Sequence, residues 1–238
     1  MKHSQQSQSK SEKDNNLFTY KNKSTFSRFW IVYKFYLRNL FRLLWHFKIL
    51  KNILSEDIWE ARETALYDVL GLECNVLFLR LGGVYVKLGQ FLSNLNHVLP
   101  LNFTSQLQNL QDKLPPHSFI EIKQRIEDEF GEPVEKVFPG IEEKPIAAAS
   151  TAQVHIVYIE KKKLAVKILY PGIEKIVAKD LKTVYFIMKR INRYLFSFDY
   201  RKIFKEIDVV ITREMDLSQE AHSLTKMKNL FKTEKNII

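Results

Sequence analysis

The sequence predicts a mostly helical α+β fold with one short antiparallel sheet. Helical patterns run through long stretches, most clearly 25–54, 173–196 and 202–231. Two short runs rich in β-branched and aromatic residues, 153–159 and 164–169, lie on either side of a charged turn and indicate a β-hairpin. The chain of 238 residues, 45% hydrophobic and 27% charged, is long enough to bury a core.

The net charge and the cysteine content indicate the class of binding partner and the redox state of the compartment. The net charge of +10 indicates an anionic partner: membrane lipid, nucleotide or nucleic acid. Nucleic acid is disfavoured, because the basic residues accompany an apolar stripe and no motif that reads DNA or RNA is visible. Cys74 is the single cysteine, so no internal disulfide forms and a reducing compartment is expected, such as a bacterial cytoplasm or an organelle interior.

The N-terminal part divides into a tail and a helix. Residues 1–24 are expected to be a disordered polar tail without the apolar core of a secretory signal. Residues 25–54 contain no acidic side chain and predict a basic amphipathic helix. Its apolar stripe consists of Phe29, Val32, Tyr36, Leu40, Leu43, Phe47, Leu50 and Leu54.

Two uses of this helix remain open. A basic amphipathic helix with Trp and Phe suits an anionic membrane–water interface, where it would lie flat without spanning the bilayer. The same stripe could instead dock on the domain that follows. No run of 18 or more uncharged apolar residues occurs, so a spanning helix is not expected.

Residues 55–135 are expected to form a helical extension. Ser55 followed by two acids indicates a helix start, and breaks are expected near Gly71 and at Gly82-Gly83. The run Lys87-Leu88-Gly89-Gln90 places a glycine inside a helix, where it costs about 1 kcal/mol against alanine. The glycine suggests that another part of the protein approaches the helix closely at Gly89. The alternative is that the run is an ordinary helix start with a solvated Lys87.

Residues 136–238 contain the hairpin, with Glu160–Lys163 expected as a four-residue loop. Lys167 lies in the run Leu-Ala-Val-Lys-Ile-Leu, where a cation among apolar neighbours needs an anionic partner or water. A kinase lysine in a Val-Ala-Ile-Lys strand binds nucleotide phosphates and a helix glutamate. The alternative is an edge strand whose lysine faces water.

Taken together and in order, these motifs resemble the UbiB/ADCK family of atypical protein-kinase-like proteins, which is associated with quinone and isoprenoid lipid metabolism. Lys87 to Gln90 matches the KxGQ signature, Ala147-Ala148-Ala149-Ser150 the alanine-rich nucleotide loop, and Lys167 the nucleotide lysine. Glu214-Met215-Asp216 matches the ExD signature, and Glu220 the helix glutamate that follows. The fold implied for residues 136–238 is the N-lobe of a kinase.

The resemblance assigns roles to these residues. Ala147, Ala148, Ala149, Ser150, Lys167 and Glu220 are implied to bind adenine nucleotide, with Lys167 and Glu220 as an ion pair. Lys87 and Gln90, with Glu214 and Asp216, are implied to form a regulatory contact in which Lys87 pairs with Glu214 and excludes protein substrates. Because alanine enters the left-handed region only at a cost of about 1–2 kcal/mol, the alanine loop should be stiffer than a glycine-rich one. The alternative is that the alanines merely begin a strand or a helical turn.

In that family the catalytic Asp and Asn and the metal-binding motif belong to a C-terminal lobe. The 238 residues contain no His-x-Asp and no Asp-Phe-Gly sequence. We therefore expect an incomplete member, truncated, split or fragmentary, with no catalytic residue and no metal ligand of its own. ATP or ADP with Mg²⁺ is expected as cofactor only of the complete protein.

The function that the resemblance implies is the N-terminal part of an atypical kinase or ATPase acting at a membrane on a quinone-like or isoprenoid lipid. Where the gene is split, a separate C-lobe chain is the expected partner. The localisation implied is peripheral association with a membrane. The alternative function is a non-catalytic membrane-surface adaptor, or a lipid-binding remnant of the family.

Overall fold

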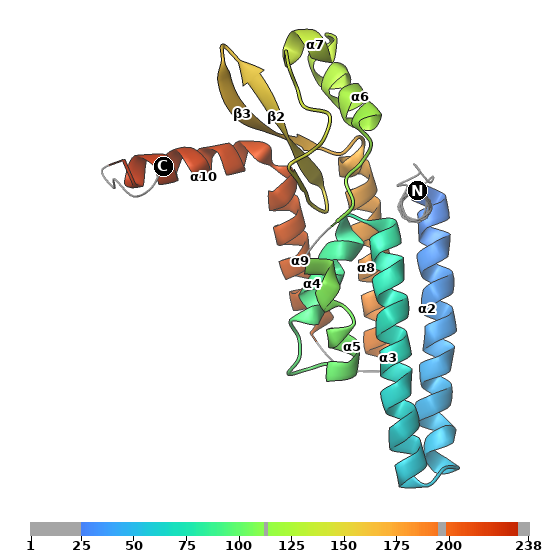
Figure 1. The fold of residues 1–238 in the computed structure, drawn as a ribbon. Helices are drawn as coiled ribbons and strands as arrows, with labels where there is room; N and C mark the ends of the chain where they lie inside the picture. Colours follow the sequence, from blue (N-terminus) through green and yellow to red (C-terminus); the bar gives the residue numbers. More distant parts are fainter. Residues whose placement is uncertain (1–24, 112–113, 195–198, 233–238) are drawn as a thin grey trace, which may run out of the picture. The chain divides into compact units, whose positions relative to one another are not determined.

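A computed structural model describes residues 25–111, 114–194 and 199–232 (Figure 1). It confirms the predicted class: helices dominate, with one three-stranded antiparallel sheet. The chain forms two compact units, residues 1–198 and 199–238, so the boundary falls within the predicted kinase-like segment 136–238. The predicted polar tail, residues 1–24, lies outside the described residues.

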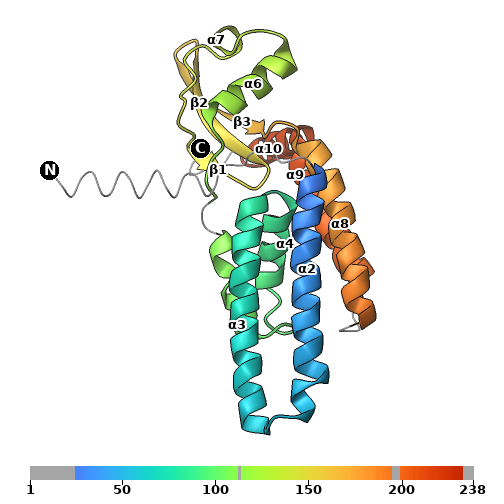
Figure 2. The ribbon, with the colours of Figure 1, turned by 90° about the vertical axis from the view of Figure 1, so that its right-hand side faces the viewer.

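The first unit opens with a helical hairpin (Figure 2). It consists of α2 (Thr25–Lys48), the 3₁₀ turn η1 (Leu50–Asn52) and α3 (Glu56–Leu81). Three short helices follow: α4 (Val84–Ser93), α5 (Leu101–Ser105) and η2 (Gln108–Gln111). The long helix α8 (Ile173–Tyr194) packs against α2 and α4.

The glycines at the two predicted helix breaks have different structural roles. Gly82 and Gly83 have φ values of 64° and 51°, a region that favours glycine, and they separate α3 from α4 as predicted. The predicted break at Gly71 is wrong, because α3 continues through it. A Cβ atom there would lie 2.8 Å from the backbone carbonyl oxygen of Phe103, so glycine is needed for close packing on α5.

The buried side of α2 includes part of the predicted stripe: Val32, Tyr36 and Leu43. Three polar residues share this side, namely Arg28, Asn39 and His46. Rings of Phe29 and Tyr33 approach Phe186 of α8. The stripe is therefore used for docking within the protein, which is the second of the two uses that the sequence left open.

The sheet contains β1 (Ala147–Ala148), β2 (Ala152–Ile159) and β3 (Lys162–Leu169) in the order β1-β2-β3. Ile159 pairs with Lys162, so the connection is a two-residue turn and the predicted four-residue loop is wrong. Glu160 and Lys161 both have positive φ, 49° and 66°, as a type I′ hairpin turn requires.

Helix α6 (Phe119–Phe130) starts at a capping box in which Ser118 accepts from the Glu121 backbone and the Glu121 carboxylate accepts from the Ser118 backbone. It ends at Gly131 in the left-handed conformation, and the one-turn helix α7 (Val134–Val137) follows. The α6 helix lies against the sheet, where the Phe119 and His155 rings are 5.8 Å apart.

The second unit consists of α9 (Tyr200–Met215) and α10 (Leu217–Leu230). The sequence pattern predicted one helix over 202–231, which is wrong at Asp216. The Asp216 carboxylate accepts hydrogen bonds from the backbone N–H groups of Ser218 and Gln219 and starts a new helix.

Candidate functional site

Helix α4 carries the KxGQ signature and is held tightly on its neighbours. A Cβ at Gly89 would lie 2.3 Å from Leu110 Cδ1 and 2.7 Å from Phe78 Cδ2, which confirms the predicted close approach. The Gln90 side-chain amide donates to the backbone carbonyl of Leu110 at 2.8 Å. Glycine and glutamine therefore fix α4 against α3 and η2, while Lys87 on the same helix is half-buried.

A buried ion pair lies beside the start of α4 and was missed by the sequence reasoning. The Arg28 guanidinium on α2 donates to both carboxylate oxygens of Asp180 on α8 and, at 2.9 Å, to the backbone carbonyl of Leu81. Both side chains of the pair are only 5% exposed. Arg28 also lies 5.8 Å from the centre of the Tyr85 ring. It thus joins α2 and α8 to the last residue before the Gly82-Gly83 turn.

Burial governs the ionisation of the groups around this pair. It raises the pKa of Asp180, an effect that the hydrogen bonds and charge of Arg28 oppose. Burial also raises the pKa of the Tyr85 hydroxyl. A guanidinium keeps its proton in proteins, so Arg28 stays a cation in this enclosed position.

The alanine segment is partly strand and partly turn. Ala147 and Ala148 form β1, and the backbone N–H of Ala149 donates to the Ala152 carbonyl at 2.8 Å. Tyr170 donates its hydroxyl proton to the Ala149 carbonyl at 3.0 Å. None of the alanines has positive φ, so the segment avoids the conformation that would be costly for alanine.

Lys167 and Ala147 lie in one row on the same face of the sheet. Val154 on β2 is paired on one side with Ala147 and on the other with Lys167. Residues directly opposite each other on neighbouring strands project from the same face. The row Ala147–Val154–Lys167 is half-buried to exposed, and it lies on the face opposite to the one that carries Gln153 and His155.

Gln153 and His155 form a second feature that the sequence reasoning missed, although both lie in the run that contains the alanine loop. His155 Nδ1 is 2.7 Å from the Glu142 carbonyl, which can only accept, so Nδ1 carries the proton and Nε2 accepts from the Gln153 amide at 2.8 Å. Gln153 Oε1 accepts from the backbone N–H of His117 at 2.9 Å. This buried network holds His117, in the segment between η2 and α6, against the sheet.

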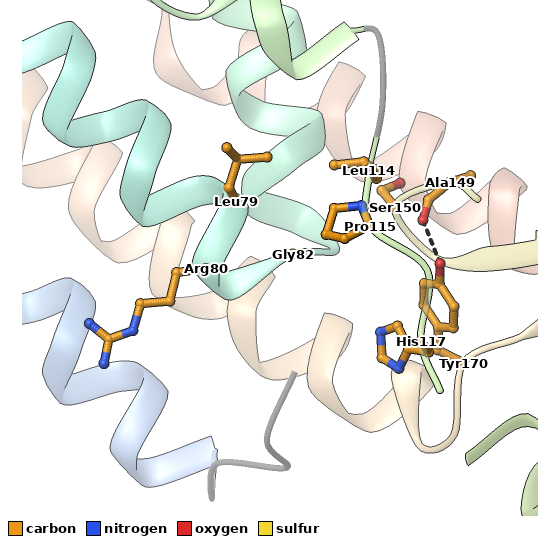
Figure 3. A pocket seen from close by; sticks show the side chains of 9 residues that line it. All are labelled: Leu79, Arg80, Gly82, Leu114, Pro115, His117, Ala149, Ser150 and Tyr170. Carbon is orange, nitrogen blue, oxygen red and sulfur yellow. Dashed lines mark hydrogen bonds between the residues drawn. The ribbon is translucent and has the colours of Figure 1, made fainter. Parts of the chain in front are cut away.

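Behind the alanine segment lies a small pocket (Figure 3) of about 40 Å³. The Ser150 hydroxyl is buried there and has no hydrogen-bond partner among the described residues. The rings of His117 and Tyr170 stack with centres 3.7 Å apart. A pocket of this size holds water molecules but is far below the several hundred Å³ of a typical small-molecule site. It is therefore too small for a nucleotide.

The His117 ring predicts a pH effect on stability. Burial lowers the pKa of His117, and the Glu121 carboxylate, 3.5 Å away, opposes this. Because the folded protein favours neutral His117, its stabilisation is complete above pH 6.5, the ordinary pKa, and is lost as the pH falls below it. The free energy of unfolding from urea titrations should therefore decrease on acidification, and H117Q should flatten this decrease.

H222Q, which replaces an exposed histidine on α10, is the control for the substitution itself. Burial lowers the pKa of His46 as well, so H117Q should reduce the pH dependence without abolishing it. Stability that rises on acidification would contradict the assignment of His117 as a buried neutral ring.

The predicted carboxylates belong to the second unit. Glu214 lies in the last turn of α9, Asp216 caps α10, and Glu220 lies in the first turn of α10. Hydrogen bonds from Ser218 and Gln219 lower the pKa of Asp216. Lys87 and Lys167 belong to the first unit, so the two Lys–Glu pairings stay predictions. Within the described ranges, no group of three or more His, Cys, Asp or Glu side chains could hold a metal ion.

Comparison with known proteins identifies the family. The profile of the ABC1 atypical kinase-like domain matches residues 109–238. An aarF domain-containing protein kinase of Arabidopsis thaliana, described as chloroplastic and uncharacterized, is 34% identical over 164 residues, which are 66% of this chain and 30% of that protein. A probable protein kinase UbiB of Shewanella baltica is 33% identical over 193 residues, 79% of this chain and 34% of the relative.

Among solved structures, the complex of Rv3197 with erythromycin from Mycobacterium tuberculosis aligns with 78% of this chain and 46% of that one, with a TM-score of 0.42 and 23% identity. The chain spans about a third of the length of the curated relatives it matches. The matched domain covers more than half of the chain and includes the alanine segment, Lys167 and the ExD residues. The chain belongs to the ABC1 atypical kinase-like family, to which the UbiB proteins are related.

Proposed function

We propose that this chain provides the nucleotide-binding N-lobe and helical extension of a UbiB-like atypical kinase or ATPase. It acts at a membrane surface in quinone or isoprenoid lipid metabolism. The observation that carries the nucleotide part is the row Ala147–Val154–Lys167, in which the first residue of the alanine segment and the lysine lie on the same sheet face. Membership of the family supports the reaction class, transfer or hydrolysis of a phosphoryl group.

The chemistry of the row suits a nucleotide. The Lys167 ammonium is a mobile cation that can contact phosphate oxygens, and Val154 and Ala147 beside it present small apolar surfaces. When ATP or ADP is bound with Mg²⁺, the metal neutralises phosphate charge. In this proposal Lys167 orients the phosphates, Glu220 orients Lys167, and Lys87 with Glu214 closes the site to protein substrates.

Replacement of Lys167 by methionine is expected to weaken binding of a fluorescent ATP analogue by about 10-fold or more. A charge-assisted hydrogen bond contributes about 1.5–3 kcal/mol, which corresponds to this range. The measurement is a fluorescence titration of the 238-residue chain with Mg²⁺ present. Lys163 is the matched control, because it lies on the same strand and the same face but at the exposed turn end, so K163M should change affinity by less than about twofold.

The proposed partner of Lys167 can be examined in the same assay. If Lys167 and Glu220 act together, E220Q should weaken binding in the native background and have little further effect in K167M. Equal affinity of K167M and the native chain would contradict the nucleotide site. If the native chain binds lipid but no nucleotide, the result would instead favour the non-catalytic adaptor.

A further inference from the structure

Helix α2 has a second apolar side that the sequence reasoning did not identify. Five large side chains on it are exposed, with fractions from 42% to 70%: Phe26, Trp30, Leu37, Phe41 and Trp45. Their spacing of four and seven residues places them on one side of the helix. This side is opposite to the one that carries Arg28, Val32 and Tyr36 and packs on α8.

The neighbouring helix α3 has a similar exposed side. Its residues Ile58, Val69, Leu72 and Val76 are 45% to 62% exposed and recur at helical spacing. Figure 2 shows α2 and α3 side by side, with α4 behind them. The Arg38 guanidinium on α2 donates to the Glu73 carboxylate on α3 at 2.6 Å, which links the two helices at this point.

We call these nine side chains the outer face: Phe26, Trp30, Leu37, Phe41 and Trp45 of α2, with Ile58, Val69, Leu72 and Val76 of α3. All nine side chains are at least 42% exposed. Single exposed apolar residues are ordinary, whereas several on one side of a helix indicate an interaction surface. Its aromatic residues also contact one another, as Phe41 and Trp45 stack with ring centres 6.2 Å apart.

The charges beside the α2 part of the outer face are basic, whereas α3 also carries exposed acidic residues at its start, Glu56, Asp57 and Glu60. Helix α2 contains no acidic residue, and Lys34 and Lys48 are exposed beside its aromatic side. On α3, Arg62 and Arg80 fall within the same exposed side, while Glu73 is occupied by Arg38 and Arg42. A partner that fits must therefore offer both an apolar layer and negative charge.

We propose that the outer face lies flat on an anionic lipid bilayer, with its Trp and Phe side chains at the headgroup level. This proposal rests on the proposed action at a membrane surface and specifies which side of the helix makes the contact. Trp, Phe and Lys on one helix side is the combination expected for an interfacial helix. Within the described ranges no helix is long and apolar enough to cross a bilayer. A second copy of the chain fits less well, because two basic faces repel each other.

Flotation of the 238-residue chain with vesicles tests this. Vesicles of phosphatidylcholine mixed with phosphatidylserine should bind the chain, and vesicles of phosphatidylcholine alone should bind it much less. The triple variant W30S/F41S/W45S should lower the partition coefficient by more than about tenfold. K34Q should lower it by about fivefold, as expected for one basic residue near an anionic surface.

Matched controls come from exposed residues elsewhere on the first unit. The triple variant I120S/F130S/I146S removes large apolar side chains that are 57% to 81% exposed but lie outside the helical hairpin of α2 and α3. It should leave the partition coefficient unchanged. K136Q, on α7, is the corresponding control for charge.

Tryptophan quenching by brominated lipid shows which tryptophan side chains of the vesicle-bound chain lie in the lipid. Fluorescence from Trp30 and Trp45, isolated in W59F, should be quenched. Fluorescence from Trp59, isolated in W30F/W45F, should not be quenched, because Trp59 stacks on His46 between α2 and α3.

The outcomes separate this inference from the proposed function. Binding that requires phosphatidylserine and the outer face supports it. Binding that is insensitive to the outer-face variants overturns it and leaves membrane action standing, whereas no binding to either vesicle overturns both. Self-association that W30S/F41S/W45S abolishes, without vesicle binding, would show that the face is a contact between copies and would overturn the proposal.

Discussion

Replacing Arg28 with alanine is expected to lower the free energy of unfolding by about 3–5 kcal/mol. The change leaves the Asp180 carboxylate in a place where it is 5% exposed and has lost the guanidinium that compensates its burial. It also removes the donor to the Leu81 carbonyl. At about 2–4 °C per kcal/mol for a chain of this size, the melting temperature should fall by roughly 6–20 °C.

An exposed ion pair supplies the control. Arg125 lies 2.9 Å from Glu174, and these side chains are 25% and 45% exposed. R125A should therefore cost at most about 1 kcal/mol. The measurement is urea and thermal unfolding of both variants, followed by circular dichroism. A loss of less than about 1 kcal/mol in R28A would show that water reaches Asp180.

The position of Arg28 suggests why its effect extends to the candidate site. It holds α2 to α8 at the point where α3 ends and the Gly82-Gly83 turn leads into α4. If the outer face of α2 contacts a bilayer, Arg28 is the buried link between that contact and the helix that carries Lys87. R28A should consequently disturb α4 more than it disturbs the sheet.

The sequence was informative where a local rule decides the structure. Helical spacing located α2, α6 and α8, and the Gly82-Gly83 pair located the α3–α4 break. The family motifs implied an alanine loop, whereas Ala147 and Ala148 form the edge strand β1. The hairpin was found, but its turn was not, because Glu160 and Lys161 take positive φ without a glycine. Cross-strand pairing over the whole hairpin fixes that turn.

Other errors concern contacts between residues far apart in the sequence. Arg28 was one of several basic residues on α2, and only its burial beside Asp180, 152 positions later, distinguishes it. The buried side of α2 was predicted from apolar residues alone, whereas Arg28, Asn39 and His46 also lie on it. The predicted stripe does pack on the core, whereas the second, exposed apolar side of α2 was not identified from its spacing.

Alanine at Gly71 is expected to destabilise the protein by about 1–3 kcal/mol, although alanine normally stabilises a helix interior by about 1 kcal/mol relative to glycine. The new Cβ would lie 2.8 Å from the Phe103 carbonyl oxygen and 2.9 Å from Gln106 Cβ. Because the carbonyl oxygen belongs to the backbone of α5, the strain is relieved only if the helix moves away from α3. Urea unfolding of G71A measures the loss.

Gly89 offers the matched comparison, because its clash involves side chains instead of backbone. A Cβ there meets Leu110 Cδ1 and Phe78 Cδ2, which rotamer changes or truncation can move. In a double-mutant cycle, L110A should therefore reduce the cost of G89A by about 0.5–3 kcal/mol, whereas Q106A should leave most of the cost of G71A in place. Equal relief in both cycles would mean that α5 yields as easily as a leucine side chain, and that the close packing of α3 on α5 does not require glycine.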